Sequence, residues 1–508
     1  MDVVVAPPRV WGHRVHFRFE LSEPTTTQRR NRWSVSFPGT SLRGIPRELL
    51  LENFLALQLP VWAVQDPAAT VRLPMSMPRA VVEWWLAYHR LDTMTVGPLS
   101  DDAPVTLEGL PRRGSSAGRT AVMFGGGKDS TLAYEALAEK LGADRVLLVH
   151  MVHPFSARRG ASSQAQRRAE RQILAPLRRR GAEIKVVRTD FIANLRAHAK
   201  VRPGVLLYFG AALAGLIAAD CAAATVSHTA GGYWVKDRVG KPAMWGNRRL
   251  RPEWLETLSD YYEVRLGRPL ELSTTHYAVS EYLSFATLLE RYPAALDGVV
   301  MCMREPQPGR RWCYDCKKCF EYAVFGLSRG YVDGSFDYQT MFTARYTTGL
   351  HKHAKTAPRD ERTGLALWSP RVGTPTHFAS MCHALHHLDP SLLVDRVDSR
   401  VLKRLVVLRG AYGTTSFPAV ETIVRAAIDL PRAQAARIVA EVAAEHHEVV
   451  PEQAGPLLRG DEPVGYAYGT RMPVDLPVPE AGSAERAAVP AASVVRAPGP
   501  TVTGPFEG

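Results

Sequence analysis

Three glycines followed by a lysine, an aspartate and a serine are the residues whose types and spacing could most directly do chemistry. An apolar strand is predicted just before them, at residues 121–124, and a helix just after them, at residues 131–141. Glycines let the backbone turn sharply, and the first turn of a helix offers unpaired N–H groups at the positive end of its dipole. Phosphate oxygens satisfy both features. The segment therefore predicts a phosphate-binding loop, made of Gly125, Gly126, Gly127, Lys128, Asp129 and Ser130.

Each polar residue of this loop has an expected role. Lys128 and Ser130 would contact phosphate oxygens, and Asp129 would hold Mg²⁺ directly or through water. A Walker A loop is excluded, because that loop needs four residues between its first glycine and Gly-Lys-Ser/Thr. A tight turn from strand to helix with incidental polar residues is the alternative interpretation.

A second group of reactive residues is a cysteine cluster with the spacing Cys-x10-Cys-x2-Cys-x2-Cys. Such clustering is typical of metal ligation rather than of disulfides. Four thiolates predict tetrahedral Zn²⁺, and four protein ligands leave no open position, so we expect a structural site. An iron–sulfur cluster and free thiols are the alternatives. The predicted ligands are Cys302, Cys313, Cys316 and Cys319.

The other cysteines and a group of histidines are assigned to packing. Cys221 and Cys382 lie in apolar stretches, where a free cysteine packs as a small hydrophobe. His383, His386 and His387 could hold a metal on one helix, but the sequence identifies no nearby carboxylate partner for them. We therefore expect these histidines on the surface or in the core.

Strands alternate with helices from residue 121 to the cysteine cluster. This alternation predicts an α/β fold, with a parallel sheet covered by helices on both faces. Strands are predicted at residues 121–124, 145–152, 183–188, 225–227, 270–273 and 299–301. Helices are predicted at residues 131–141, 164–180, 205–224 and 279–291.

Four regions are predicted along the chain. They are an N-terminal α+β domain at residues 1–107, an α/β domain at residues 120–330 that ends in the cysteine cluster, a mostly helical region at residues 331–471, and a disordered tail at residues 472–508. In the first region, alternation predicts strands at residues 15–21 and 33–37, with helices near residues 47–59 and 79–88. In the third, the clearest helices are expected at residues 419–428 and 432–444.

Composition narrows the class of protein. The chain has 508 residues, of which 46% are hydrophobic and 22% charged, as in ordinary soluble proteins. The sequence has no apolar run long enough for a membrane span and no secretory signal, so we expect a cytoplasmic protein with no membrane partner. The net charge of +13 fits either a solvated basic surface or an attraction for polyanions, and it does not choose between a nucleotide and RNA.

The phosphate loop resembles the Ser-Gly-Gly-x-Asp-Ser loop of the ATP pyrophosphatase (PP-loop) superfamily, with Gly125 in place of the leading serine. The resemblance implies a fold like that of the adenine nucleotide alpha-hydrolases and a requirement for ATP and Mg²⁺. Enzymes of this superfamily cleave ATP between the α and β phosphates, hold pyrophosphate in the loop and transfer AMP to a substrate oxygen. The resemblance also implies that residues near 148–151 contact adenine and that a second ligand-binding site lies in the loop at residues 227–238.

Two families within this superfamily share more features with the chain. Residues 120–330 resemble 7-cyano-7-deazaguanine synthase in the order of the loop, a polar loop and a terminal zinc site. That family lacks the long regions on both sides. The whole layout is most similar to the UDP-N-acetylmuramoyl-L-alanyl-L-glutamate epimerase (MurL) family, through the N-terminal domain, the Gly-Gly-Gly-Lys-Asp-Ser loop and the cysteine knuckle that begins at Trp312.

The MurL resemblance covers most of the chain except the tail. It implies an isomerase of peptidoglycan precursor synthesis, which adenylates the terminal L-glutamate of a UDP-muramoyl dipeptide and epimerises it to D-glutamate. The implied partner is this nucleotide-linked, anionic small molecule rather than a nucleic acid. The oligomeric state is not predicted.

An epimerase of this kind needs groups that remove and return a proton. By position, the candidates are His228, Lys236, Asp237 and His276. Each could equally be an ordinary polar residue of a loop. Three other functions stay open: a nitrile- or amide-forming enzyme similar to 7-cyano-7-deazaguanine synthase, a PP-loop tRNA-modifying enzyme that would use Cys221 as its catalytic cysteine, and a nucleotide-binding module without catalysis.

Overall fold

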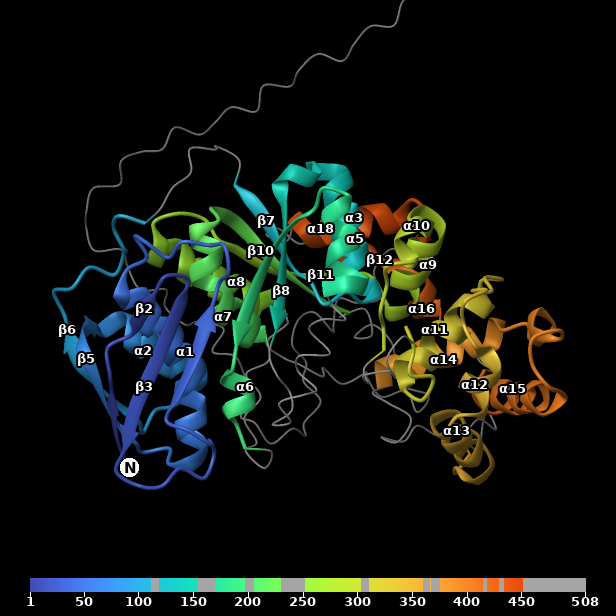
Figure 1. The fold of residues 1–508 in the computed structure, drawn as a ribbon, viewed down its shortest axis with the longest axis horizontal. Helices are drawn as coiled ribbons and strands as arrows, with labels where there is room; N and C mark the ends of the chain where they lie inside the picture. Colours follow the sequence, from blue (N-terminus) through green and yellow to red (C-terminus); the bar gives the residue numbers. More distant parts are fainter. Residues whose placement is uncertain are drawn as a thin grey trace, which may run out of the picture.

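One large sheet organises the molecule in the computed structural model (Figure 1). The structure describes residues 1–110, 118–152, 170–196, 205–229, 252–302, 310–359, 366, 375–413, 418–428 and 434–450. The 11-stranded sheet has the order β11-β10-β7-β8-β9-β4-β3-β1-β5-β6, with β2 paired to β3 beside this path. No helix in the described part of the chain is long and apolar enough to cross a membrane.

Five parallel strands form the half of the sheet that carries the phosphate loop. They are β7 (Arg119–Met123), β8 (Val146–Val152), β9 (Glu183–Thr189), β10 (Cys221–Thr229) and β11 (Glu271–His276). Successive side chains of a strand point to opposite faces. Accordingly, Ala121 and Met123 belong to one hydrophobic core, and Val122 and Phe124 to the other. This burial on both faces explains the continuous apolar runs of the sequence.

Helices cover both faces of these strands. The core on one face contains residues of α3 (Lys128–Leu141), α9 (Glu281–Arg291) and most of the buried residues of α18 (Gln434–Ala444). The core on the other face contains residues of α7 (Val205–Ala218), α8 (Pro252–Leu266) and α1 (Arg47–Gln65). A mixed, mostly parallel sheet flanked by helices confirms the predicted α/β fold at this level.

The N-terminal region continues the same sheet. Its strand β4 (Arg32–Ser36) pairs antiparallel with β9, opposing Val35 to Thr189. On the helical side, Arg265 of α8 donates from Nε to Glu52 of α1 at 2.7 Å, and both side chains are buried. The remaining elements of this region are β1 (Asp2–Val5), β2 (Arg9–Trp11), β3 (Arg14–Leu21), β5 (Thr70–Pro78), α2 (Arg79–His89) and β6 (Thr95–Ser100).

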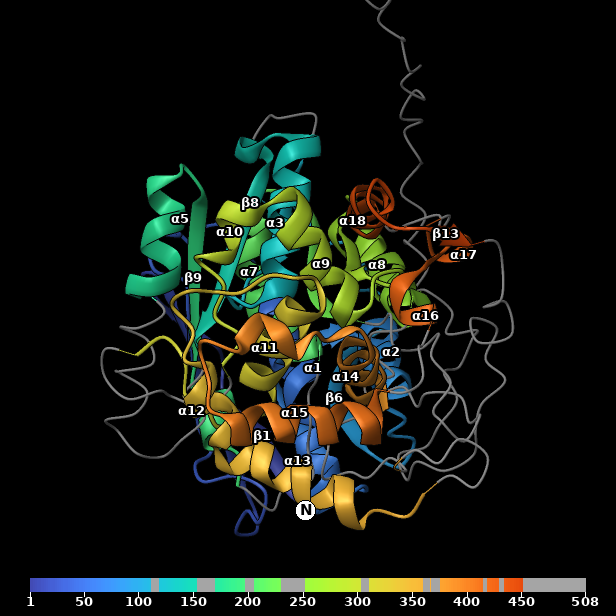
Figure 2. The same cartoon turned by 90° about the vertical axis from the view of Figure 1, so that its right-hand side faces the viewer.

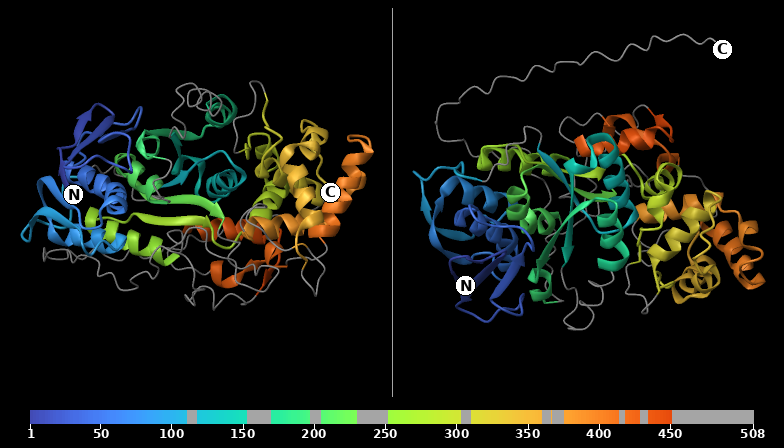
Figure 3. Two further views of the ribbon diagram at one scale, coloured as in Figure 1. Left: turned by 90° about the horizontal axis from the view of Figure 1, so that it is seen from below. Right: turned by 45° about the horizontal axis from the view of Figure 1, so that its top comes forward.

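Helices beyond the sheet gather at the end of the molecule opposite the N-terminal strands (Figures 1 and 3). Figure 2 views this end directly, with α11, α13, α14 and α15 facing the reader. The elements from α10 onward are α10 (Pro293–Leu296), α11 (Lys317–Ser328), α12 (Tyr338–Thr343), α13 (Arg345–Thr356), α14 (Pro375–His387), α15 (Ser399–Tyr412), α16 (Pro418–Glu421), β12 (Ile423–Val424), α17 (Arg425–Ile428) and β13 (Val449–Val450). The short helices α5 (Ala175–Arg179) and α6 (Phe191–Asn194) lie on either side of β9 in the chain. The predicted tail falls outside the described residues.

Three predicted elements are wrong. The helix expected at residues 205–224 ends at Ala218, because Asp220 takes a left-handed φ of 58° and residues from Cys221 onward pair with β7. The strand expected at residues 299–301 is absent from the described structure there, and the Val300 N–H instead donates to the Gly126 carbonyl at 2.8 Å. The helix expected at residues 419–428 is broken by β12, which pairs with β13.

Candidate active site

The phosphate loop joins β7 to α3, as the sequence predicts. Gly126 has a φ of 77°, and a Cβ there would lie 2.5 Å from the side chain of Ile173, so only glycine fits. Gly127 is the N-cap of α3 and no side chain caps the helix. The N–H groups of the first turn therefore face the loop without a side-chain acceptor, which is the arrangement that binds phosphate oxygens.

Buried charges surround this loop. Lys128, only 1% exposed, contacts Asp129 and lies 3.0 Å from Oε2 of Glu281 on α9. Lys318 of α11 lies 2.8 Å from the same Glu281 oxygen and 3.0 Å from Oε2 of Glu321. Burial opposes the charged form of Lys318, but Glu281 and Glu321 together raise its pKa. We refer to Lys128, Asp129, Glu281, Lys318 and Glu321 as the loop ion network, in which each lysine lies against two carboxylates.

The loop ion network refines the expected roles of the loop residues. The Lys128 ammonium already contacts the carboxylates of Asp129 and Glu281. To contact a phosphate oxygen, it would therefore have to give up one of these two contacts. Ser130 donates its hydroxyl to the Gly127 carbonyl at 3.2 Å, which places the hydroxyl inside the loop. Asp129, with 19% of its side chain exposed, is more accessible than Lys128 and is thus better placed to meet an incoming Mg²⁺.

Replacing Glu281 by glutamine is expected to destabilise the fold by about 1–3 kcal/mol, because the buried Lys128 would keep only Asp129 and Lys318 only Glu321 as carboxylate partners. Urea unfolding of the full chain measures this change. Glu441→Gln, an exposed position on α18, is the matched control and is expected to change the free energy of unfolding by no more than about 0.5 kcal/mol. Equal effects of the two substitutions would contradict the assigned role of Glu281.

Two of the predicted acid–base residues lie at the sheet edge that carries the loop. His276 is the last residue of β11, and His228 lies near the end of β10, the strand between β11 and β7. Parallel strands present their carboxyl ends at one edge, where open α/β sheets bind ligands. His276 is fully buried, and its Nδ1 lies 2.6 Å from the Thr275 hydroxyl. The side chain of His228, together with Lys236 and Asp237, lies outside the described residues, so their roles remain predictions.

His150 on β8 is a residue that the sequence interpretation did not single out. Its Nδ1 lies 2.9 Å from the carbonyl of Phe124, the residue before the loop, and burial lowers the pKa of the ring. The neutral ring therefore donates from Nδ1–H to that carbonyl. A histidine near the end of an otherwise apolar strand is the signal that could have identified it.

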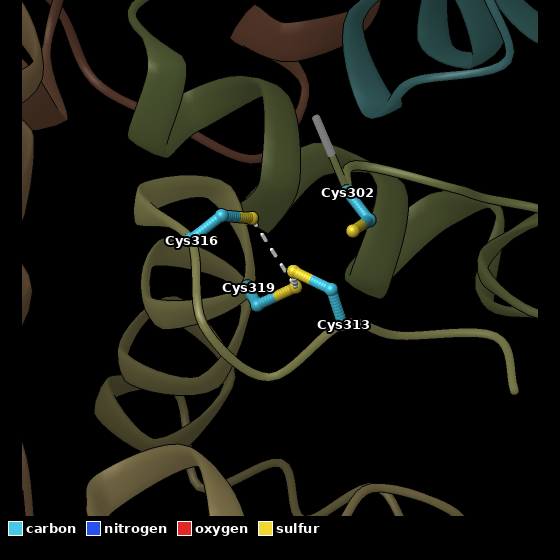
Figure 4. Close-up of side chains that lie close together, drawn as sticks. All are labelled: Cys302, Cys313, Cys316 and Cys319. Atoms are coloured by element: carbon cyan, nitrogen blue, oxygen red, sulfur yellow. Dashed lines mark hydrogen bonds between the residues drawn. The ribbon is translucent and has the colours of Figure 1, made fainter. Parts of the chain in front are cut away.

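The four clustered cysteines converge on one point (Figure 4). All four sulfur atoms lie within 4.8 Å of one another, with Cys319 Sγ 3.8 Å from Cys313 Sγ and 3.5 Å from Cys316 Sγ. A tetrahedral ion with Zn–S bonds of about 2.3 Å separates its sulfurs by about 3.8 Å. The cysteines are therefore positioned to bind one metal ion. An iron–sulfur cluster fits less well, because it holds its thiolates on different iron atoms and so farther apart.

Residues next to the clustered cysteines are linked to the phosphate loop at two points. Lys318 of the loop ion network lies between Cys316, the N-cap of α11, and Cys319. On the other side, the Val300 N–H holds the Gly126 carbonyl two residues before Cys302. A metal ion in the cluster would thus fix both segments that support the loop.

Comparison with known proteins gives no relative from which to transfer a function. No family model matches the chain, and no curated protein matches it at a significant level. The loop, the cysteine cluster and the carboxyl ends of the parallel strands are therefore the features that bear on the class of protein.

Proposed function

We propose that the chain is an ATP-dependent adenylating enzyme with a PP-loop. The observation that carries the proposal is the loop itself: three glycines between a buried parallel strand and a helix that no side chain caps. Asp129 is more accessible there than its partner Lys128. Such a loop suits pyrophosphate, which offers many oxygens to backbone N–H groups and needs Mg²⁺ to offset its charge. The fold of the nucleotide-binding half is, on this proposal, that of the adenine nucleotide alpha-hydrolases.

The proposed reaction begins with attack of a substrate carboxylate oxygen on the α-phosphorus of ATP. The bond from the α-phosphorus to the oxygen that bridges to the β-phosphorus breaks, and its electron pair leaves with pyrophosphate. N–H groups at the start of α3 and the Ser130 hydroxyl would hold the departing pyrophosphate. Asp129 would hold Mg²⁺, whose charge would stabilise this leaving group. The product is an acyl adenylate whose acyl group carries no charge.

Within this class we propose an amino-acid epimerase that acts on UDP-N-acetylmuramoyl-L-alanyl-L-glutamate. Adenylation makes the glutamate α-proton more acidic, because removing it no longer places a second negative charge beside a carboxylate. A base then removes the proton, an acid returns one to the opposite face, and water releases AMP and the D-glutamyl product. His228, Lys236, Asp237 and His276 are the candidates for proton transfer. The choice of substrate depends on the MurL resemblance and on a net charge of +13, which suits a tetra-anionic substrate.

We also propose that the metal held by the cysteine cluster is Zn²⁺ with a structural role. Four thiolates fill its tetrahedral coordination, so the ion has no open position for substrate. Its contribution is to hold the segments on either side of the phosphate loop.

The substrate is tested by incubating the purified protein with ATP, Mg²⁺ and one candidate carboxylate, and measuring pyrophosphate. The proposal predicts release with UDP-N-acetylmuramoyl-L-alanyl-L-glutamate, together with deuterium uptake from D₂O at the glutamate α-carbon. If pyrophosphate is released only with 7-carboxy-7-deazaguanine and ammonia, the chain instead catalyses the nitrile-forming reaction. Release without deuterium uptake would keep the adenylation and reject the epimerisation.

Cys221 is expected to be unreactive in the native protein, which argues against the tRNA-thiolating alternative. The side chain is buried on β10, and burial raises the pKa of its thiol to about 12. Since only the thiolate attacks an electrophile, the neutral thiol should persist at pH 7–9, well below this pKa. Mass spectrometry after iodoacetamide treatment should find Cys221 unmodified in the folded chain and modified in urea. Rapid native labelling would restore the thiolation hypothesis.

A further inference from the structure

A second cluster of metal-ligating side chains lies at the helical end of the molecule. His383 and His387 occupy positions i and i+4 of α14, so they share one face of the helix. Glu421, at the end of α16, supplies the carboxylate that the sequence alone did not reveal. Figures 1 and 2 show α16 beside α14. One ligand atom from each of the three residues lies within 4.8 Å of those of the other two.

Both histidine rings lie close to the same carboxylate oxygen of Glu421. Oε1 of Glu421 lies 2.7 Å from Nε2 of His383 and 3.5 Å from Nε2 of His387. His383 is fully buried, yet neither of its ring nitrogens makes a hydrogen bond of good geometry with any described residue. A buried polar atom in this state needs an explanation, and an ion is one. An ion bound to both residues would lie off the line between nitrogen and oxygen, which fits a short contact between His383 and Glu421 that is not a hydrogen bond.

We propose that His383, His387 and Glu421 bind a divalent transition metal ion, independently of the cysteine cluster and of the proposed function. Two imidazoles and one carboxylate are a ligand set that Zn²⁺ and Fe²⁺ accept, and three protein ligands leave a position for water or an anion. This set differs from the cysteine cluster, whose four thiolates leave no such position.

The surroundings favour neutral imidazoles, which are the form that binds metal. Burial and the neighbouring His387 and His386 lower the pKa of His383 to about 3, and burial lowers that of His387. Two positive charges near the rings favour the neutral form in the same way. Arg329 lowers the pKa of both rings and forms an ion pair with Glu290, and Arg409 lowers the pKa of His387.

The two partly exposed ligands allow a test that does not depend on disrupting the core. His387 and Glu421 have side chains 41% and 39% exposed, so His387→Ala and Glu421→Ala should fold. His386→Asn is the matched control: His386 is adjacent on α14, but its Nδ1 contacts the Gly413 carbonyl and it is not part of the cluster.

The experiment is a titration of the metal-depleted full chain with Co²⁺ and, separately, with Zn²⁺. The wild-type chain should bind two Co²⁺ ions. The ion in the cysteine cluster should give sulfur-to-cobalt charge-transfer bands, and the further ion, at the histidine site, should give none. His387→Ala and Glu421→Ala should weaken its binding at least about 100-fold and leave the sulfur bands unchanged, whereas His386→Asn should keep it. The proposal is overturned if the wild-type chain binds only the sulfur-ligated ion, or if both ligand variants keep the further ion.

Discussion

Asp129→Asn is expected to lower ATP-dependent pyrophosphate release by about 10²–10³-fold, the usual effect of removing one group that stabilises charge in a transition state. Asparagine keeps the shape of the side chain but loses the negative charge that would hold Mg²⁺ at the pyrophosphate. The fold should persist, because Lys128 keeps its ion pair with Glu281 at 3.0 Å. The measurement is steady-state pyrophosphate release by the full chain, with circular dichroism as the check on folding.

Asp144→Asn is the control for this prediction. Asp144 is an exposed carboxylate just beyond the far end of α3, and removing its charge should leave the rate within about twofold, as for surface positions away from the site. If Asp129→Asn retains a rate similar to that of Asp144→Asn, the loop does not use Asp129 for the metal.

Cys319→Ser is expected to remove the metal ion of the cysteine cluster and to destabilise the chain by roughly 5 kcal/mol or more. The reason is that binding a structural Zn²⁺ contributes about 10–16 kcal/mol in small zinc-dependent folds, and most of this becomes folding free energy. Cys319 is fully buried, and its sulfur lies 3.8 Å from that of Cys313 and 3.5 Å from that of Cys316. Metal analysis by mass spectrometry and urea unfolding measure the two effects.

The loss of this ion should also loosen the phosphate loop. Lys318 lies inside the cysteine knuckle and contacts Glu281, which in turn contacts Lys128. A change in the knuckle is therefore expected to reach the phosphate loop through these contacts. Hydrogen exchange at residues 126–130 should therefore become faster in Cys319→Ser. Cys221→Ser replaces a buried cysteine outside the cluster and should keep both the ion and the slow exchange. Slow exchange in both variants would contradict the coupling.

The phosphate loop was predictable because its determinants are local. An apolar strand, three glycines and a helix follow one another without a gap, so the pattern of residues 121–141 was enough to define the turn. Cys313, Cys316 and Cys319 were predictable for the same reason, since short spacers bring their sulfurs together. The α/β fold followed from burial of β7 on both faces, which left a continuous apolar run.

Contacts between distant segments were not predictable. Glu281 reaches Lys128 because α9 packs against α3, and Lys318 reaches Glu281 because α11 packs against α9. No periodicity in the sequence reports that packing. The sequence shows His383 and His387 but does not show that Glu421 lies beside them, because α16 is far from α14 in the chain. The sequence predicts a helix through residues 222–224, the alanine-rich start of β10, since alanine favours helices and the pairing with β7 is nonlocal.

The central claim is that the chain cleaves ATP between its α and β phosphates, and ³¹P NMR of the reaction products tests it most directly. The full chain is incubated with ATP, Mg²⁺ and the muramoyl dipeptide substrate, and the phosphorus signals are followed with time. The account predicts AMP and pyrophosphate in equal amounts, both lost in Asp129→Asn. ADP and orthophosphate, formed at a rate that Asp129→Asn does not change, would contradict it.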